Sequence, residues 1–250
     1  MDQKQNRYIV NKLLGETPLE ALERMRIIEG LDSSIPMTYA GRLDPMAEGV
    51  LLILMGEECK NKDSYLGLDK EYEVEVLFGF ETDTGDTLGK IKNQELKNKN
   101  EIEIEEINSE LQKFKGKFLQ EYPAYSSKTV DGVQLHTLAN KGELPEEMPT
   151  KEVEIYDIKI LEEREINSEI LLREIKNNIS KVKGDFRQSE IIDLWEKNLI
   201  EKNIFKIIKI KVSCSSGTYM RSLAHNLGVK LGVSALAYSI KRMRVGGYSL

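Results

Sequence analysis

Asp44 is the titratable residue whose neighbours constrain the backbone most clearly. It lies in the stretch G-R-L-D-P-M-A-E-G over residues 41–49. Gly41 permits unusual backbone angles, while Pro45 fixes its own φ and disfavours helical geometry at Asp44. We therefore expect a tight turn that holds the carboxylate in place, with an Asx-turn or a helix cap as the purely structural alternative. The unbroken apolar run from Val50 to Met55 predicts a buried strand behind this turn.

Most familiar catalytic and metal-binding motifs do not occur in the sequence. There is no G-x-S-x-G, P-loop, G-x-G-x-x-G or H-E-x-x-H pattern. The two histidines, His136 and His225, give little material for a Ser-His-Asp arrangement. The two cysteines, Cys59 and Cys214, lack the spacing of a metal site or a disulfide framework. Residues 81–87 lack the terminal glutamate of a calcium loop, so we expect no metal. Composition alone leaves a glycosidase pair of carboxylates open, although no second acidic residue is framed so sharply.

Basic residues gather in the last part of the chain, although the chain as a whole is acidic. With 40% hydrophobic and 31% charged residues and a net charge of −6, the composition is that of a soluble globular protein. From Ile204 to Leu250 there are eight basic and no acidic residues, which leaves 28 basic against 42 acidic residues before them. This asymmetry predicts a phosphate-binding surface, with a solvated basic face as the alternative. The eight are Lys206, Lys209, Lys211, Arg221, Lys230, Lys241, Arg242 and Arg244.

Hydrophobic periodicity indicates the elements that must position these residues. A capping box at Thr17 predicts a helix that reaches Ile28. Alternation over Lys70–Phe80 predicts a half-buried strand with Tyr72 on its inner face. Further strands are expected over 7–10, 152–161, 169–174 and 206–214, and helices over 57–66, 104–114, 135–140 and 189–199, from 220 onward and within 234–250. Strands separated by irregular helices favour an α+β fold over a regular βαβ alternation.

Five sequence blocks go beyond these general patterns. They are G-R-L-D-P-M-A-E-G-V-L, D-K-E-Y with T-D-T-G-D downstream, P-A-Y-S-S-K with D-G, S-S-G-T-Y-M-R, and I-K-R. In their order and approximate spacing the chain resembles the TruB-like tRNA pseudouridine synthases, from Tyr8 to Tyr248. The resemblance implies the pseudouridine synthase fold, which has a mixed, largely antiparallel central sheet, flanking helices and an active-site cleft.

By this resemblance, the reaction is the isomerisation of uridine to pseudouridine, in which uracil leaves C1′, turns and rejoins through C5. The family uses no cofactor or metal, but it needs an ionised carboxylate at the ribose–base junction. That group corresponds to Asp44, as a nucleophile or as a base. An apolar pocket disfavours an ionised carboxylate unless a cation is near. Arg221 matches the arginine of the family's motif and could supply that cation, with a phosphate contact as the alternative. Tyr72 corresponds to the family's stacking tyrosine, Tyr219 to a second pocket tyrosine and Ile240 to an apolar wall.

The resemblance also implies a tRNA partner, recognised mainly by the shape of its T-loop, with position 55 as the target. Residues 121–142 match the family's RNA-gripping insertion, in which Lys128 is expected to meet phosphate. Asp86 in T-D-T-G-D and Arg242 in I-K-R are further RNA-binding candidates. Tyr39 stands five residues before the aspartate, where the family commonly has histidine. It could stack in the space that the flipped base leaves.

We expect one catalytic domain over residues 1–250, with a helical insertion at about 177–203 and without the C-terminal RNA-binding domain that many relatives carry. The N-terminus lacks a signal peptide and no stretch approaches the roughly 18 apolar residues of a membrane span. We therefore expect a cytoplasmic monomer that needs neither a membrane nor a protein partner. Two alternatives stay open: the same chemistry on another tRNA site or on ribosomal RNA, and a non-catalytic RNA-folding module.

Overall fold

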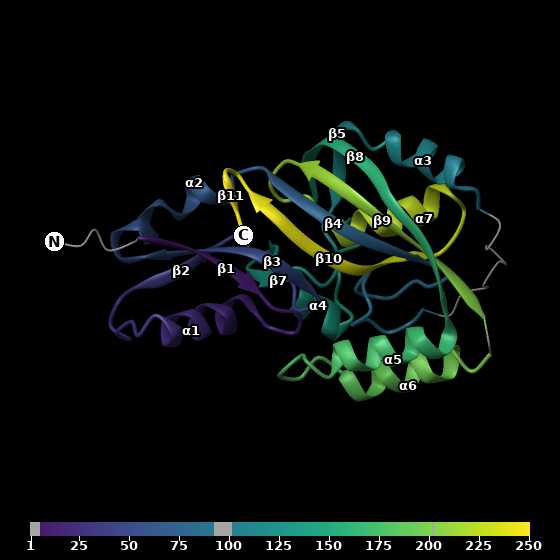
Figure 1. Ribbon diagram of the computed structural model, residues 1–250, viewed down its shortest axis with the longest axis horizontal. Helices are drawn as coiled ribbons and strands as arrows, with labels where there is room; N and C mark the ends of the chain where they lie inside the picture. Colours follow the sequence, from purple (N-terminus) through teal and green to yellow (C-terminus); the bar gives the residue numbers. More distant parts are fainter. Residues whose placement is uncertain (1–5, 93–101, 202) are drawn as a thin grey trace.

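The centre of the molecule is a nine-stranded sheet with helices packed on both faces (Figure 1). The structure, a computed structural model, describes residues 6–92, 102–201 and 203–250. The strands of the sheet are β1 (Arg7–Lys12), β2 (Met37–Ala40), β3 (Ala47–Met55), β4 (Lys70–Phe78), β5 (Gly116–Glu121), β8 (Thr150–Asn167), β9 (Ile204–Cys214), β10 (Ala235–Val245) and β11 (Tyr248–Ser249). A separate two-stranded sheet pairs β6 (Thr129–Val130) with β7 (Val133–Gln134).

The helices are irregularly spaced along the chain, as the α+β fold predicts. They are α1 (Pro18–Ile28), the 3-10 helix η1 (Gly56–Asn61), α2 (Lys62–Leu66), α3 (Ile104–Gln112), α4 (Leu135–Lys141), α5 (Ser168–Ile179), α6 (Gln188–Asn198) and α7 (Met220–Lys230). Within the described residues, none of the helices is long and apolar enough to cross a membrane.

The order of the strands brings distant parts of the chain together. It is β1-β3-β10-β4-β9-β8-β5, with β2 against β3 and β11 against β10. Strand β10 runs parallel to β3, with Ile240 opposite Ala47, and antiparallel to β4. Gly49 of β3 has a φ of 104°, and a Cβ there would lie only 2.2 Å from the backbone oxygen of Arg242. The glycine therefore permits the close approach of β3 and β10 beside the Asp44 turn.

Two hydrophobic clusters lie on opposite faces of this sheet (Figure 1). Helices α3 and α7 cover one face, where Val74 and Leu227 belong to the same cluster. Helices α5 and α6 cover the other face, where Leu77 and Trp195 belong to the second cluster. Alternate residues of β4 therefore face different layers, as the two-residue period of a strand requires.

Much of the periodicity analysis is confirmed. The capping box is present, because Thr17 accepts from the backbone of Glu20 while the glutamate side chain accepts from the backbone of Thr17. Strand β4 buries Tyr72 on its inner face. Helix α3 buries Ile107 and Leu111. These elements follow from local sequence alone.

Two predicted elements are wrong. Residues 169–174 form part of α5 and not a strand, because Leu171, Ile175 and Ile179 repeat every four residues and are all buried. The helix predicted within 234–250 is β10, which continues to Val245. This strand lies between β3 and β4, so its conformation is determined by pairing on both sides.

Two segments outside the central sheet are connected to the site by hydrogen bonds. The predicted helical insertion over 177–203 contains the end of α5 and all of α6, and we call these two packed helices the α5–α6 pair. The predicted RNA-gripping segment, residues 121–142, contains the small β6–β7 sheet and α4. Its first part, residues 122–128, has neither helix nor strand and is held by isolated backbone hydrogen bonds at Tyr122, Ser126 and Lys128 together with side-chain contacts.

Candidate active site

Asp44 lies in a tight turn that leads directly into β3, as predicted. The Asp44 carbonyl accepts a hydrogen bond from Ala47 N at 3.0 Å, and Pro45 O accepts one from Gly15 N at 2.8 Å. The backbone of the turn is therefore held from within and from a neighbouring loop. The Asp44 side chain remains 40% exposed, so its carboxylate is both fixed and accessible.

Arg242 supports this turn from behind. Its side chain is buried, and its guanidinium donates to the carbonyls of Val50 at 2.7 Å, Arg42 at 3.1 Å and Gly41 at 3.3 Å. A side chain with 1% exposure has no donor left at the surface. Arg242 therefore holds the Asp44 turn, and its contact with RNA stays a prediction.

Arg221 is the partner of Asp44. Its Nε lies 2.8 Å from Asp44 Oδ2, while its own side chain is only 4% exposed. NH1 donates to Thr84 O at 2.6 Å and NH2 donates to Tyr125 O at 3.0 Å. Burial lowers the pKa of Arg221, but Asp44 and Asp86 more than offset this effect and raise it. The guanidinium is therefore charged, internally held and directed at the carboxylate.

Asp86 is buried behind Arg221. It is 5% exposed, and its Oδ1 accepts from Thr84 Oγ1 at 2.7 Å and from Leu88 N at 3.0 Å. Its other oxygen, Oδ2, lies 3.8 Å from Arg221 Nε. Burial raises the pKa of Asp86, although Arg221 acts against this effect. This carboxyl group faces Arg221, and the predicted RNA contact of Asp86 stays a prediction.

Tyr72 and Ile240 belong to the hydrophobic cluster that also contains Leu43, the residue before Asp44, and Ala47, three residues after it. Tyr72 is 8% exposed, and burial raises the pKa of its phenol, partly offset by Arg242. The structure therefore brings the predicted stacking tyrosine and the predicted apolar wall residue next to the aspartate turn. Such a surface can contact an uncharged ring.

Tyr219 lies just before α7, in the incoming loop. Its backbone is extended, with φ −94° and ψ 115°, which allows it to share a site with Arg221 as the sequence required. Gln120 fixes it by accepting from Tyr219 N at 2.7 Å and donating to Tyr219 O at 3.1 Å. The Tyr219 ring also contacts Tyr122, with centroids 5.7 Å apart. Sequence analysis missed Gln120, since a single glutamine in a strand gives no signal.

Tyr39 lies apart from this cluster, whereas Lys128 lies at its edge, beside Tyr122. Tyr39 is opposite Ile53, which is about 20 Å along β3 from Ala47 at the usual rise per residue. Its ring packs near Val10 and has the Lys62 ammonium 5.5 Å from its centroid. Lys128 is exposed, with its ammonium 5.3 Å from the centroid of the Tyr122 ring. RNA contacts of Tyr39 and Lys128 stay predictions.

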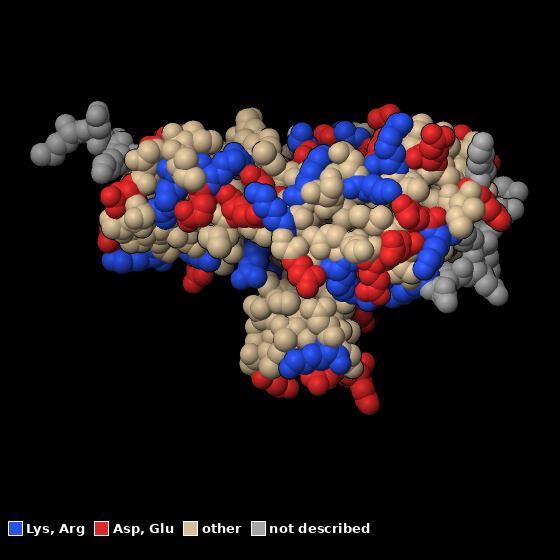
Figure 2. Space-filling view, turned by 90° about the horizontal axis from the view of Figure 1, so that it is seen from below, with Lys and Arg blue, Asp and Glu red and all other residues tan. Residues whose placement is uncertain are grey.

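The basic residues after Ile204 do not form the free surface that their clustering in sequence predicts. Arg221 and Arg242 are buried, and Lys230 lies over the ring of Phe114. The other five pair with glutamates: Lys206–Glu163, Lys209–Glu73, Lys211–Glu71, Lys241–Glu48 and Arg244–Glu71. On the face shown in Figure 2, basic and acidic side chains are interspersed. The prediction is corrected because the sheet places these basic strands beside acidic ones.

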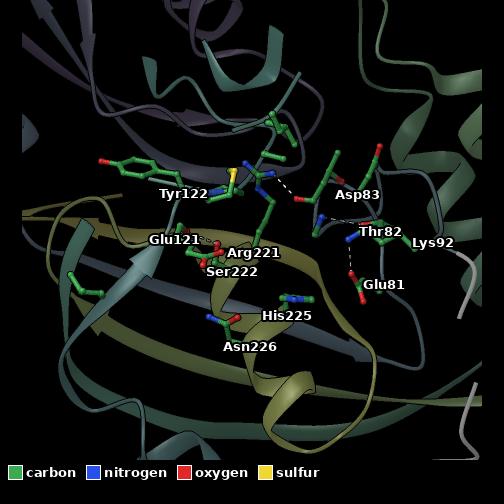
Figure 3. Close-up of a pocket in the computed structure, with 17 residues that line it drawn as sticks. Glu81, Thr82, Asp83, Lys92, Glu121, Tyr122, Arg221, Ser222, His225 and Asn226 are labelled. Atoms are coloured by element: carbon green, nitrogen blue, oxygen red, sulfur yellow. Dashed lines mark hydrogen bonds and ion pairs between the residues drawn. The ribbon is translucent and has the colours of Figure 1, made fainter. Parts of the chain in front are cut away.

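A cavity of about 460 Å³ adjoins the site, between the loop after β4, β5 and α7 (Figure 3). Arg221 and Tyr122 line it, as do Ser222 and His225 of α7. Asp44 is not among its lining residues, so the cavity opens beside Arg221 and not onto the reacting face. Its volume falls within the range of small-molecule sites.

The whole arrangement suits carboxylate chemistry beside an apolar wall. A fixed, accessible carboxylate has a buried cation on one side and Tyr72, Tyr219 and Ile240 nearby. Over the ranges that the structure describes, no group of three or more His, Cys, Asp or Glu residues is placed to hold a metal ion. The residues of the site itself therefore provide a charge pair and a surface for a planar ring.

Sequence comparison decides the family. Residues 36–178, more than half of the chain, match the model of "TruB family pseudouridylate synthase (N terminal domain)". The chain belongs to the TruB family. It is 30% identical over 232 residues to tRNA pseudouridine synthase B of Clostridium tetani, which covers 93% of this chain and 65% of that protein. It is 31% identical over 242 residues to the protein of the same name from Borreliella afzelii, which covers 97% of this chain and 70% of the relative.

Solved structures confirm the fold of this TruB-family chain. A crystal structure of a Cbf5-Nop10-Gar1 complex matches with a TM-score of 0.59 and 18% identity, over 97% of this chain and 49% of that one. A structure of an H/ACA RNP bound to a substrate RNA containing 2′-deoxyuridine matches with a TM-score of 0.55, also at 18% identity, over 97% and 48% of the two chains. The chain thus spans about half the length of these solved chains and 65% to 70% of the two curated relatives. At this identity the structural likeness shows the fold alone.

Proposed function

We propose that this TruB-family chain converts uridine to pseudouridine in tRNA, at position 55 of the T-loop, without a cofactor. The observation that carries the proposal is the ion pair between a buried arginine and a partly exposed aspartate, 2.8 Å from Arg221 Nε to Asp44 Oδ2. The names of the relatives support the substrate class, since both are tRNA pseudouridine synthases.

In this proposal the reaction rearranges one nucleotide without adding or removing atoms. The bond between C1′ and N1 breaks, a bond between C1′ and C5 forms, the proton on C5 leaves, and N1 gains a proton. Asp44 acts at the ribose–base junction, where its carboxylate must be ionised. Arg221 supplies the adjacent positive charge, preorganised by the Thr84 and Tyr125 carbonyls.

Tyr72, Tyr219 and Ile240 form the surface against which the detached uracil turns. A base must leave its stack to enter such a site, which costs a few kcal/mol, and aromatic contact recovers part of that cost. Two of these residues are strand residues of β4 and β10, and Tyr219 is held by Gln120. The pocket is therefore built on rigid elements, which keeps the base and the carboxylate in register.

RNA binding is assigned mainly to residues 121–142. This segment carries Lys128 exposed beside Tyr122, a cation and an aromatic ring that suit phosphate and base contacts. The proposal also includes a single catalytic domain over residues 1–250, since one sheet runs from β1 to β5, with action as a cytoplasmic monomer. Tyr39, near the end of β2, is proposed to contact RNA by stacking in the space that the flipped base leaves.

The activity test uses a T-stem-loop RNA that carries tritium on C5 of its uridines. Release of tritium together with pseudouridine at position 55 is the expected result, and replacement of that uridine by cytidine should abolish the signal. Equal rates on a T-stem-loop and on unrelated tRNA or ribosomal RNA hairpins would reject the T-loop assignment. Binding of RNA with no tritium release from any of these RNAs would instead indicate an RNA-folding module.

A further inference from the structure

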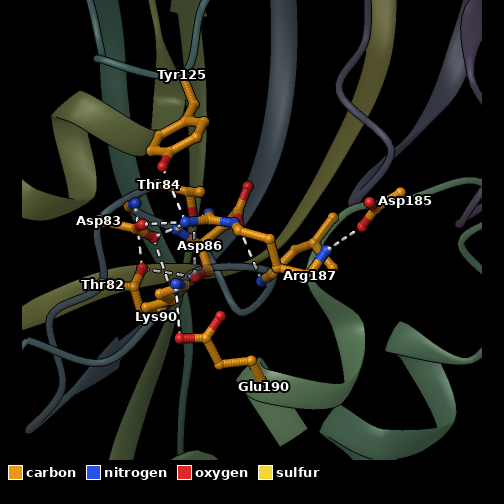
Figure 4. Close-up of polar contacts among 11 residues, drawn as sticks. Thr82, Asp83, Thr84, Asp86, Lys90, Tyr125, Asp185, Arg187 and Glu190 are labelled. Atoms are coloured by element: carbon orange, nitrogen blue, oxygen red, sulfur yellow. Dashed lines mark hydrogen bonds and ion pairs between the residues drawn. The ribbon is translucent and has the colours of Figure 1, made fainter. Parts of the chain in front are cut away.

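Arg187 connects the α5–α6 pair to the site from outside (Figure 4). It lies just before α6 with φ 62° and ψ 26°, a left-handed conformation that is uncommon for residues other than glycine. Its NH1 donates to Asp83 Oδ2 at 2.7 Å and to Tyr125 OH at 2.9 Å. The guanidinium carbon also lies 4.6 Å from the centroid of the Tyr125 ring.

The same two segments hold Arg221 from inside. Thr84, the residue after Asp83, accepts from Arg221 NH1 at 2.6 Å through its carbonyl. Tyr125 accepts from Arg221 NH2 at 3.0 Å through its own carbonyl. One arginine thus binds the side chains of Asp83 and Tyr125, and the other binds the backbone of Tyr125 and of the neighbour of Asp83. The loop after β4 and residues 122–128 are thus both hydrogen-bonded to the guanidinium groups of Arg187 and Arg221.

The α5–α6 pair gives Arg187 a rigid support. Trp195 of α6 is buried, and its Nε1 donates to Thr87 O at 3.1 Å. Its ring packs on Phe80, with centroids 4.9 Å apart. Glu190 pairs with Lys90 at 2.6 Å, so α6 is fixed to the same loop from several directions. Arg187 therefore acts from a position that cannot easily shift.

Tyr125 has more need of this contact than Asp83. Residues 122–128 have neither helix nor strand, whereas Asp83 N donates to Lys90 O at 3.0 Å and Asp83 Oδ1 accepts from Lys90 N at 2.8 Å. Arg187 and the direct interaction between Tyr125 and Asp83 fix the Tyr125 side chain to the folded loop after β4. Loss of the Arg187 contacts would let the Tyr125 carbonyl move, and with it one of the two acceptors that orient Arg221.

We propose that Arg187 is a positioning residue of the reaction, which keeps Arg221 directed at Asp44 by fixing Asp83 and Tyr125. The inference rests on the proposed function, because it assigns to Arg221 a part in the chemical step. It gives the α5–α6 pair a part in catalysis although no residue of that pair contacts Asp44 in the structure. A 1 Å misplacement of a reacting group can lower a rate by about two orders of magnitude, so a change outside the site can be measured.

The test compares Arg187→Met with Lys176→Met, which also removes a cation from the α5–α6 pair but breaks only its exposed ion pair with Glu196. Single-turnover tritium release at saturating RNA should fall about tenfold or more in Arg187→Met and less than twofold in Lys176→Met. RNA affinity and its salt dependence should not change. Arg187→Lys should recover part of the rate, since lysine still reaches a carboxylate but lacks the planar fork of arginine.

A double-mutant cycle and hydrogen exchange complete the test. Tyr125→Phe removes the hydroxyl that Arg187 bonds, so the rate loss of the double variant should be smaller than the product of the two single losses. Amide exchange over residues 82–86 and 122–128 should quicken in Arg187→Met, with the rest of the described chain unchanged. An unchanged rate in an active protein, or a loss seen only in RNA affinity, would overturn the inference. A wild-type protein without activity would contradict the proposed function instead, and unchanged exchange would still overturn the link through Arg187.

Discussion

Arg221 Nε lies 2.8 Å from Asp44 Oδ2, although Asp44 belongs to a turn near the start of the chain and Arg221 to a helix near its end. The pair is asymmetric, since the arginine side chain is 4% exposed and the aspartate side chain 40%. The guanidinium of Arg221 contacts Asp44, Thr84 and Tyr125, and lies 3.8 Å from Asp86. A guanidinium with 4% exposure offers little surface to a phosphate, which supports the proposal that Arg221 acts on the carboxylate.

Arg221→Met should therefore impair chemistry and leave RNA binding intact. We expect the single-turnover rate to fall about 100-fold or more, the cost of losing one preorganised charge beside a reacting group. Rates at saturating RNA and binding titrations at two salt concentrations separate the two effects. Arg173→Met, an exposed arginine of α5, is the matched control. Normal single-turnover chemistry with weaker, salt-sensitive binding would refute the ion-pair role.

Arg242→Met should destabilise the protein without changing the salt dependence of RNA binding. The carbonyls of Gly41, Arg42 and Val50 would lose a buried donor, which should lower the free energy of unfolding by about 2 kcal/mol or more. Urea denaturation measures this change. Lys241→Met, on the same strand but about half exposed, should alter stability by less than about 0.5 kcal/mol. A flatter salt dependence with unchanged stability would show that Arg242 binds phosphate after all.

Lys128→Ala should reduce the salt dependence of tRNA binding. One lost phosphate contact lowers the slope of log affinity against log salt by about 0.7 to 0.9. Filter binding between 50 and 200 mM salt gives the slope, and Lys60→Ala, an exposed residue of η1 paired with Glu57, serves as the control. Equal slopes for Lys128→Ala and wild type would place the contact elsewhere.

Lys70 makes stability depend on pH in the alkaline range. Burial, and to a smaller extent the positive charge of Arg242, lowers the pKa of Lys70 from 10.5 to about 8. Between these two values the unfolded chain binds more protons than the folded one, so stability rises with pH. The free energy of unfolding of wild type relative to Lys70→Met should increase by about 2 kcal/mol from pH 7 to 9.5. A difference that is flat over this range, or that falls, would show that Lys70 titrates normally in the folded state.

The sequence was sufficient to predict those elements that depend on a short, local pattern of residues. The Asp44 turn and the alternation around Tyr72 each depend on a few neighbouring residues, and the structure confirms both. Helix geometry also required that Tyr219 belong to the loop before α7, and its extended backbone agrees. The family followed from five blocks in order, because such blocks preserve residue type and spacing together.

The surroundings of the site depend on pairing between distant strands, which local patterns do not contain. Arginine is a common phosphate ligand, but Arg242 belongs to β10, which lies between β3 and β4. The guanidinium of Arg242 therefore donates to carbonyls of the Asp44 turn. The basic residues after Ile204 likewise meet glutamates on adjacent strands. Arg187 gave no signal, since an arginine in a polar loop is common and its partners, Asp83 and Tyr125, come from two other segments.

The central claim is that Asp44 performs the chemistry, and Asp44→Asn tests it most directly. The measurement is tritium release from C5-labelled uridine in a T-stem-loop RNA under single-turnover conditions, with RNA affinity and thermal unfolding measured on the same protein. The account predicts release indistinguishable from background, with binding and unfolding close to those of wild type. Release within tenfold of the wild-type rate would contradict it.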